Sequence, residues 1–171
     1  FMVQLPFLIS ADMKQAESQE DDVSIEGMRI LLAEDNELNM EIAEFLLTNA
    51  GAEIIRASNG KEAVEAFAKS GVGEVNVILM DIMMPVMDGL EATREIRTMN
   101  RSDASAVVII AMTANAFAED RKKAFDAGMN GHIAKPIDIE KLGAVILSVL
   151  NKQENLQNGK NNSMNANRLR S

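Results

Sequence analysis

Five side chains that could do chemistry follow apolar runs of the sequence, at the points where those runs end. They are Glu34, Asp35, Asp81, Thr113 and Lys135. Each has an ordinary explanation when taken alone, because an acid can begin a helix, a threonine can cap one and a lysine can face solvent. In a parallel sheet, however, the carboxyl ends of the strands share one edge, and ligands of open α/β sheets bind there. We therefore expect the five side chains to meet in one pocket.

Three carboxylates in one pocket repel one another and favour protonation unless a cation lies among them. Ligands that are all oxygen, without histidine or cysteine, indicate a hard ion, with Mg²⁺ first and Mn²⁺ as a substitute. The Lys135 ammonium and the Thr113 hydroxyl can bind further oxygens beside Asp81. A divalent cation, an ammonium and a hydroxyl around one carboxylate suit a phosphoryl group. Asp81 is then the nucleophile, and the product is an acyl phosphate.

The stretch 75–89, VNVILMDIMMPVMDG, positions the central acid. Its apolar run is long enough for a strand that is buried on both faces, and the run ends at Asp81. Pro85 and the pair Asp88-Gly89 are turn formers, so the carboxylate faces a loop at the end of a central strand. For an isolated aspartate, capping of the strand or of the following turn is the alternative interpretation.

Strand and helix patterns alternate five times along the chain. The predicted strands are 28–33, 52–57, 75–80, 107–112 and 131–134. The predicted helices cover about 36–50, 61–69, 90–99 and about 115–127, and a last helix starts at 139 after a cap at Asp138. Right-handed crossovers then require a parallel sheet with helices on both faces. The fold class is therefore α/β, a doubly wound domain over residues 27–150.

Apolar residues at helical spacing predict which faces of the helices pack inward. In the first helix the spaced residues are Leu38, Ile42, Phe45 and Leu46. In the second helix the residues predicted to be buried are Ala63, Val64, Phe67 and Ala68. In the last helix one apolar stripe consists of Ile139, Leu142, Ile146 and Val149.

The segments at the two ends differ in composition from the domain. Residues 1–9, FMVQLPFLI, alternate like a short strand, and residues 10–26 are expected to form an acidic linker. Residues 151–171 are rich in asparagine and are expected to be a polar mobile tail. A length of 171 residues suits one domain with tails. Since the first residue is Phe, we interpret the chain as a piece of a longer protein.

The composition argues against several classes of function. The net charge of −9 and the absence of Trp and Tyr argue against a nucleic-acid-binding surface. The lack of cysteine excludes disulfides and thiolate metal sites, and it permits a reducing, cytoplasmic location. No apolar run approaches the roughly 18 residues of a membrane helix. We expect no direct membrane contact of this part, while a parent protein can still be membrane-anchored.

Residues 28–150 resemble the receiver domain of two-component response regulators. The matching motifs are LLAEDN with Glu34 and Asp35, ILMDIMMPVMDG with Asp81, AMTAN with Thr113, and GHIAKP with Lys135. The motifs occur in order and cover nearly the whole domain, so the match is specific. The resemblance implies a flavodoxin-like fold with five parallel strands in the order 2-1-3-4-5 and five helices.

The resemblance also implies a role for each site residue. Asp81 accepts phosphate from a phosphohistidine, Lys135 contacts the phosphoryl oxygens, and Thr113 moves toward the phosphate and carries the signal. The implied ligands of Mg²⁺ are Glu34, Asp35, Asp81 and the backbone carbonyl of Met83. The domain is then a phosphoacceptor with slow self-dephosphorylation and not an enzyme.

One position departs from the commonest pattern of the family. Receivers often carry Tyr or Phe three residues before the lysine, as a rotating switch, and here that residue is His132, the only histidine of the chain. Either the switch is muted or the imidazole takes the part of the ring, and a pH-sensing role is a further alternative. His132 lies on a predicted strand and is a poor phosphodonor, so the phosphate must come from outside this chain.

The order of the segments resembles the receiver end of a hybrid histidine kinase. The opening FMVQLPF is similar to the final strand of histidine-kinase ATP-binding domains, and an acidic linker and a receiver follow it. The implied partners are a histidine kinase domain or a histidine phosphotransfer protein, and a homodimer through the fourth and fifth helices is a further option.

Three competing functions share parts of this pattern. The first is a receiver-like interaction module that takes no phosphate, against which an intact pocket argues. An FMN-binding module is disfavoured because Glu34 and Asp35 would repel the FMN phosphate. An aspartyl phosphatase is disfavoured because Met83 stands where its second aspartate is expected.

Overall fold

The computed structural model of the chain describes residues 24–114 and 117–168. The strand predicted at 1–9 and nearly all of the linker predicted at 10–26 lie outside the described residues. Ile25, near the end of that linker, is buried in the core. The Met28 amide donates to the Ile25 carbonyl at 3.1 Å, and the Gly27 amide donates to the Gly51 carbonyl at 2.8 Å. The folded unit therefore begins before residue 27, where the sequence pattern places its start.

Within the described residues, five strands form one parallel sheet. They are β1 (Arg29–Ala33), β2 (Glu53–Ala57), β3 (Val77–Asp81), β4 (Val108–Thr113) and β5 (Gly131–Ala134). Their order is β2-β1-β3-β4-β5, and every neighbouring pair is parallel. This result confirms the predicted doubly wound sheet. The register pairs Asp81 with Met112 and Thr113 with Ala134, so β3, β4 and β5 end side by side.

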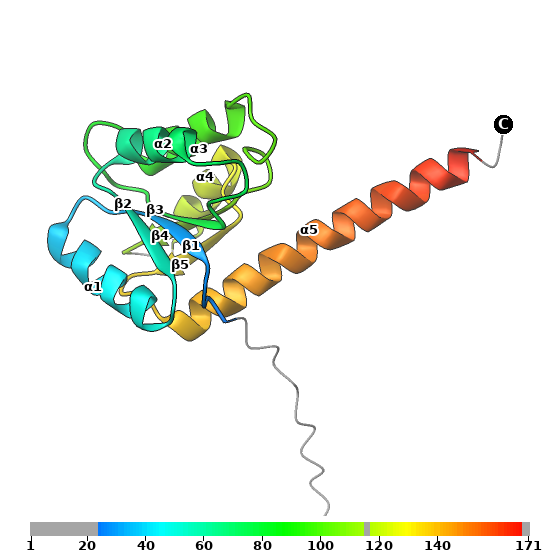
Figure 1. Cartoon of the computed structure of the whole chain (residues 1–171). Helices are drawn as coiled ribbons and strands as arrows, with labels where there is room; N and C mark the ends of the chain where they lie inside the picture. Colours follow the sequence, from blue (N-terminus) through cyan, green and yellow to red (C-terminus); the bar gives the residue numbers. More distant parts are fainter. Residues whose placement is uncertain (1–23, 115–116, 169–171) are drawn as a thin grey trace, which may run out of the picture.

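The described part of the chain also contains five helices, which cover both faces of the sheet (Figure 1). One face carries α1 (Glu37–Asn49) and α5 (Ile139–Arg168), and the other carries α2 (Gly60–Lys69), α3 (Gly89–Thr98) and α4 (Ala118–Ala127). No helix in this part is long and apolar enough to cross a membrane.

Each face of the sheet has its own hydrophobic cluster because side chains alternate along a strand. In β1, Ile30 and Leu32 belong to the cluster under α1 and α5, whereas Leu31 and Ala33 belong to the cluster under the other three helices. All four are fully buried. Strands covered on both faces read as unbroken apolar runs, which is the pattern that the sequence shows at β1, β3 and β4.

Polar caps fix the starts of the helices. Asn36, Asn59 and Asp88 each accept a hydrogen bond from the amide three residues later, at 3.0, 2.9 and 2.8 Å. Such caps satisfy amides that the helix itself leaves without partners. Asp138 caps α5 in the same way, as predicted, by accepting from the Lys141 amide at 3.2 Å.

The spaced apolar residues of the first helix predict α1 correctly but do not mark its buried face. Leu38 and Phe45 are 65% exposed and Ile42 is 46% exposed, whereas Met40, Ala43 and Leu47 are buried. Both sets are spaced like one face of a helix, so periodicity alone could not choose between them. Among the residues predicted to be buried in α2, Ala68 is also exposed, while Ala63 and Phe67 are buried.

The end of the last helix also differs from the expectation. The predicted stripe is present, with Leu142, Ile146 and Val149 buried, but α5 does not stop near residue 150 and continues to Arg168. Its first extra turn is attached to the domain, because the Gln153 side chain donates to the Ala106 carbonyl at 3.1 Å. Beyond that point α5 projects away from the domain (Figure 1). The mobility of 151–171 stays a prediction.

Two arginines bind the loops at the amino edge of the sheet, which is the edge where the strands begin. Arg97, on α3, donates to the carbonyls of Ala104 and Val107, both at 2.8 Å, and to the Gly128 carbonyl at 2.9 Å. It also donates to Asn130 Oδ1 at 2.7 Å. This one guanidinium therefore joins α3 to the segments that lead into β4 and β5.

The second arginine, Arg101, joins the end of α2 to the segment before β4. It donates to Asp103 Oδ1 at 2.6 Å and to Asp103 Oδ2 at 2.8 Å, and it binds the carbonyls of Phe67, Ser70 and Gly71. Its guanidinium also lies 4.1 Å from the centre of the Phe67 ring, within range of a cation–π contact. The hydrogen bond from Arg101 lowers the pKa of Asp103 to about 2.

Candidate functional site

The five side chains singled out in the sequence lie at the carboxyl edge, where the strands end. Glu34 and Asp35 follow β1, Asp81 ends β3, Thr113 ends β4 and Lys135 follows β5. All five line one hollow of about 330 Å³. The hollow exists because the parallel strands all end at one edge of the sheet and bring side chains from four strands together there.

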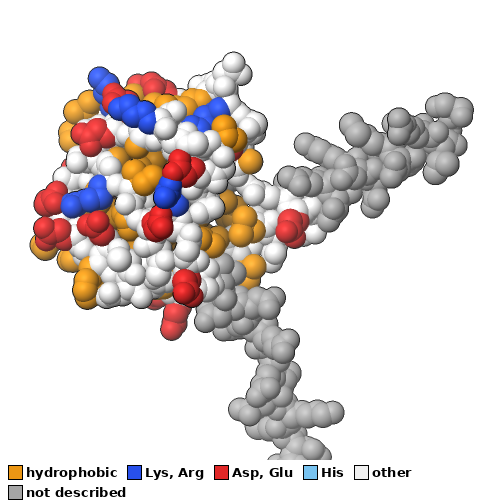
Figure 2. Space-filling model, viewed as in Figure 1, with side chains coloured by type: hydrophobic (Ala, Val, Ile, Leu, Met, Phe, Trp, Pro, Cys, Tyr) orange, Lys and Arg blue, Asp and Glu red, His pale blue; other side chains and the backbone are white. Residues whose placement is uncertain are grey.

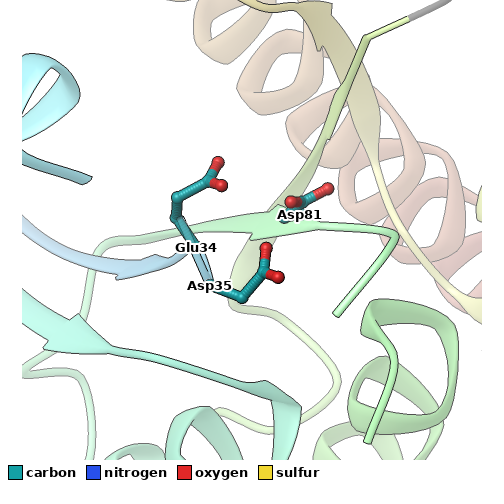
Figure 3. A group of neighbouring side chains, drawn as sticks. All are labelled: Glu34, Asp35 and Asp81. Atoms are coloured by element: carbon teal, nitrogen blue, oxygen red, sulfur yellow. The ribbon is translucent and has the colours of Figure 1, made fainter. Parts of the chain in front are cut away.

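Three carboxylates lie at the centre of this hollow. One oxygen from each of Glu34, Asp35 and Asp81 lies within 4.8 Å of the other two. Figure 3 shows the three side chains as neighbours, two from the end of β1 and one from β3. Glu34 and Asp81 are buried, whereas Asp35 is exposed. The cluster is therefore shielded from solvent at Glu34 and Asp81 and open to solvent at Asp35.

Lys135 bridges the two buried carboxylates. Its Nζ donates to Asp81 Oδ2 at 2.8 Å and to Glu34 Oε2 at 2.9 Å. Burial disfavours the charged ammonium, but the hydrogen bonds to Asp81 and Glu34 outweigh burial and raise the pKa of Lys135. The Lys135 ammonium thus donates a hydrogen bond to each of the two buried acids.

The environment of Asp81 differs from that of an exposed aspartate. Burial raises its pKa, with a smaller contribution from the charge of Glu34, and the hydrogen bond from Lys135 opposes this rise. The Met83 amide also donates to Asp81 Oδ1 at 3.2 Å. Both oxygens therefore have a donor that fixes the orientation of the carboxylate before any ligand arrives.

Glu34 has three donors from the chain itself. Its Oε1 accepts from the Asn36 amide at 3.2 Å and from the Asn39 side chain at 3.3 Å, and its Oε2 accepts from Lys135. The sequence interpretation missed Asn39. The available signal was its position three residues after Asn36, which caps α1, because this spacing turns Asn39 toward the same strand end.

The donor set of the hollow fits a hard divalent cation. Three carboxylates face one ammonium, so the site carries excess negative charge that a cation would neutralise. All the side-chain ligands are oxygens, as Mg²⁺ prefers. Met83 also lines the same hollow, and its backbone carbonyl as a further ligand stays a prediction.

The loop between β3 and α3 folds back so that the start of α3 packs against the end of β3. The Gly89 amide donates to the Ile82 carbonyl at 3.0 Å. A Cβ on Gly89 would lie 2.1 Å from the Asp81 carbonyl oxygen, so only glycine allows α3 to start this close to the strand end. Within the loop, Met83 and Val86 are exposed, and Val86 has a φ of 70°, which a β-branched residue seldom adopts.

Thr113 and His132 lie in different surroundings. Thr113 is buried and lines the acidic hollow. His132 lines another hollow, together with Lys141 and Val145 of α5, and does not line the acidic one. Burial, with a smaller contribution from the charge of Arg121, lowers the pKa of His132. A direct role of His132 at the acids is therefore disfavoured, and its role in a switch stays a prediction.

A second, mainly apolar hollow of about 280 Å³ adjoins the acidic one. It lies between α1 and the segment after β5 and is lined by Ile42, Ala43, Met112, Pro136 and Ile137. Four residues line both hollows, namely Glu34, Asn39, Met112 and Lys135. An apolar group bound beside α1 would therefore lie next to the acids.

A family model and curated relatives match this chain. The model of the response regulator receiver domain matches residues 30–147. Hybrid signal transduction histidine kinase B of Dictyostelium discoideum is 40% identical over 136 residues, which is 74% of this chain but 7% of that kinase. Hybrid signal transduction histidine kinase L of the same organism is 37% identical over 132 residues, 77% of this chain and 8% of the kinase. The chain thus spans less than a tenth of these relatives.

Solved structures give the same result. The receiver domain of a sensor histidine kinase from Pseudomonas aeruginosa, solved with magnesium coordinated in its active-site cleft, is 37% identical with a TM-score of 0.64. The match covers 73% of this chain and 98% of that one. A receiver domain from Saccharomyces cerevisiae, solved in complex with a histidine phosphotransfer protein, is 29% identical with a TM-score of 0.61, covering 71% and 87% of the two chains.

Proposed function

The chain belongs to the response regulator receiver domain family, and we propose that it takes a phosphoryl group from a phosphohistidine onto Asp81 in a two-component phosphorelay. The observation that carries this proposal is the state of Asp81. It is a buried carboxylate at a strand end, with Lys135 Nζ at 2.8 Å and two further acids beside it. An acid so placed is already oriented for attack on phosphorus.

The transfer forms one bond and breaks one. A carboxylate oxygen of Asp81 bonds to phosphorus while the P–N bond of the donor breaks, and the electron pair leaves on the imidazole nitrogen. The Lys135 ammonium neutralises charge on the phosphoryl oxygens. Glu34 holds that ammonium in place through its hydrogen bond of 2.9 Å. The product is an acyl phosphate on Asp81.

Glu34, Asp35, Asp81 and the Met83 carbonyl would hold Mg²⁺, with Mn²⁺ as a substitute. When bound, the ion supplies further positive charge at the phosphoryl oxygens. Thr113 is the residue that would report the phosphoryl group to the rest of the domain, since it is buried at the end of the neighbouring strand. We expect the acyl phosphate to hydrolyse slowly without a partner.

The proposed donor is a protein, either a histidine kinase domain or a histidine phosphotransfer protein. Support comes from α1, where Leu38, Ile42 and Phe45 are exposed, and Ile42 also lines the apolar hollow beside the acids. Figure 2 shows hydrophobic and acidic side chains next to each other on the face that carries α1. The parent of the chain is proposed to be a hybrid histidine kinase, in line with the curated relatives.

A homodimer through α4 and α5 remains a further proposal, supported by the exposed rings of Phe117 and Phe125 at α4. The main competing function, an interaction module that takes no phosphate, would leave the orientation of Asp81 by Lys135 without a purpose. Detection of one covalent product, the phosphoryl group on Asp81, distinguishes the two functions.

Acetyl phosphate with Mg²⁺ should add roughly 80 Da, the mass of one phosphoryl group. Intact-protein mass spectrometry measures the adduct. Asp81→Asn should abolish it, while Asp126→Asn, a change of an exposed aspartate on α4, should leave it in place. Chelation of Mg²⁺ should prevent labelling. A wild-type protein that stays unlabelled, or an adduct that persists in Asp81→Asn, would refute the proposal.

A further inference from the structure

The first residue of α2 touches the loop that leads from the acidic site into α3. The Gly60 amide donates to the Met87 carbonyl at 3.0 Å. Gly60 lies far from Asp81 in the sequence, and it does not line the acidic hollow. The contact therefore connects a separate helix to the backbone that carries Met83.

Only glycine permits this contact. A Cβ on Gly60 would lie 2.5 Å from the Met87 carbonyl oxygen and 2.8 Å from the Asp88 carbonyl oxygen. Both are backbone atoms, which cannot rotate away as a side chain can. The φ of Gly60 lies outside the left-handed region, so its backbone conformation does not require glycine. What requires glycine is the close approach of the loop.

The N-terminus of α2 is a firm support for the loop. Asn59 Oδ1 accepts from the Glu62 amide at 2.9 Å, and Glu62 Oε2 accepts in return from the Ser58 amide at 2.8 Å. These two bonds resemble a capping box, although Glu62 accepts from the amide before the N-cap residue Asn59, and they hold the first turn of α2 in place. Gly60 is the first residue inside it.

The loop is short and internally hydrogen-bonded, so we expect a displacement at Met87 to reach Met83. The Met87 amide donates to the Pro85 carbonyl at 2.8 Å around Val86, and the Gly89 amide closes the loop on Ile82. At the other end the Met83 amide donates to Asp81 Oδ1 at 3.2 Å. Few torsions remain between these bonds to absorb a shift.

We propose that Gly60 is a positioning residue for the metal site, because it lets α2 hold the β3–α3 loop where the Met83 carbonyl can bind Mg²⁺. The inference rests on the proposed function, in which Met83 provides a metal ligand. It adds a residue on a different helix to the determinants of metal affinity. By linkage, Mg²⁺ at Met83 must in turn stabilise the bond between Gly60 and Met87.

The first test uses the unmodified protein. Hydrogen exchange of single amides is followed by NMR with and without saturating Mg²⁺. The factor by which Mg²⁺ slows exchange should be about tenfold larger for the Gly60 amide than for the Gly27 amide. Gly27 is a matched control, because its amide donates to the Gly51 carbonyl at 2.8 Å at the opposite edge of the sheet. Equal slowing of the two amides would overturn the inference. Calorimetry of wild type with Mg²⁺ separates the two proposals, because absence of binding would instead refute the metal site.

The second test is Gly60→Ala, which should weaken Mg²⁺ binding about tenfold in calorimetry while the protein stays folded. Gly73→Ala is the control. Its φ of 76° makes alanine unfavourable, but a Cβ there meets nothing within 4 Å, so it should cost stability without changing Mg²⁺ affinity. Wild-type affinity in folded Gly60→Ala would overturn the inference. If Gly60→Ala does not fold, the exchange experiment decides.

Discussion

The two edges of the sheet treat charge in opposite ways. At the amino edge, the cations Arg97 and Arg101 bind backbone carbonyls, Asn130 and Asp103, so each guanidinium has several partners. At the carboxyl edge, three carboxylates lie together and the ammonium of Lys135 pairs with two of them, Glu34 and Asp81. Hydrogen bonds satisfy the two guanidinium groups where loops must be held together, whereas negative charge is left in excess where a ligand can neutralise it. Substitutions at the amino edge should therefore change stability, and those at the carboxyl edge should change chemistry.

Lys135→Ala tests the carboxyl edge and should have the largest effect. Labelling of Asp81 by acetyl phosphate should slow about 100-fold, because the fixed cation beside the phosphoryl group is lost. The thermal unfolding midpoint without metal should also fall, since Asp81 and Glu34 then repel each other, and Mg²⁺ should restore it. Lys141→Ala, a change of an exposed lysine, is the control. Normal labelling of Lys135→Ala would contradict the assigned role.

Arg97→Met tests the amino edge. It removes hydrogen bonds to four acceptors, so the free energy of unfolding in urea should fall by about 3 kcal/mol. Labelling of Asp81 in the folded protein should be unchanged. Arg94→Met, an exposed site on the same helix, should be nearly neutral. If Arg97→Met instead impaired labelling at full stability, the division between the edges would be wrong.

Ile42→Glu tests whether the carboxyl edge extends onto α1. Phosphotransfer from a histidine phosphotransfer protein should fall about tenfold, since a charge replaces an exposed apolar contact. Labelling by acetyl phosphate, which needs no protein contact, should stay the same. Val72→Glu, at an exposed apolar residue on the opposite edge, should change neither rate. Loss of both reactions in Ile42→Glu would indicate damage to the pocket and not to docking.

The smallest expected effect is the contribution of Asp103 to the pH dependence of stability. Its pKa is about 2 in the folded protein, below the usual value near 3.9, so the unfolded chain binds the proton more readily. Its contribution to stability is complete above about pH 4 and is lost as pH falls toward 2. Asp103→Asn should lower the unfolding midpoint by roughly 3 °C at pH 6 and by less at pH 3. Scanning calorimetry at the two pH values measures the difference, and an equal loss at both would contradict this origin.

The sequence predicts the sheet well because apolar runs and turn residues are local signals. The strand predicted at 131–134 matches β5 at both ends, and the five polar residues after the strands lie around one hollow. The inward face of α1 was not predictable, since Leu38, Ile42 and Phe45 have the same period as Met40, Ala43 and Leu47. That choice depends on packing between elements.

Contacts between distant segments were the other omission. Gly60 at Met87 and Arg97 at the segments before β4 and β5 join residues that are neighbours only in three dimensions. Nothing in the local pattern of a glycine after an asparagine indicates that a carbonyl will lie against it. The length of α5 was missed for a different reason, because an asparagine-rich composition favours loops when no packing is considered.

The burial of Ile25 bears on where a pulling force applied from the amino-terminal side would act on the domain. This residue is 2% exposed and belongs to the cluster under α1 and α5, although the family model begins only at residue 30. A pull applied at Ile25 would therefore act first on the turn at Gly27 and on Gly51, to which Gly27 is hydrogen-bonded, and not on β1. Ile25 and Gly27 hold the start of the described domain against the segment between α1 and β2, so that corner is the point through which force or torque would pass.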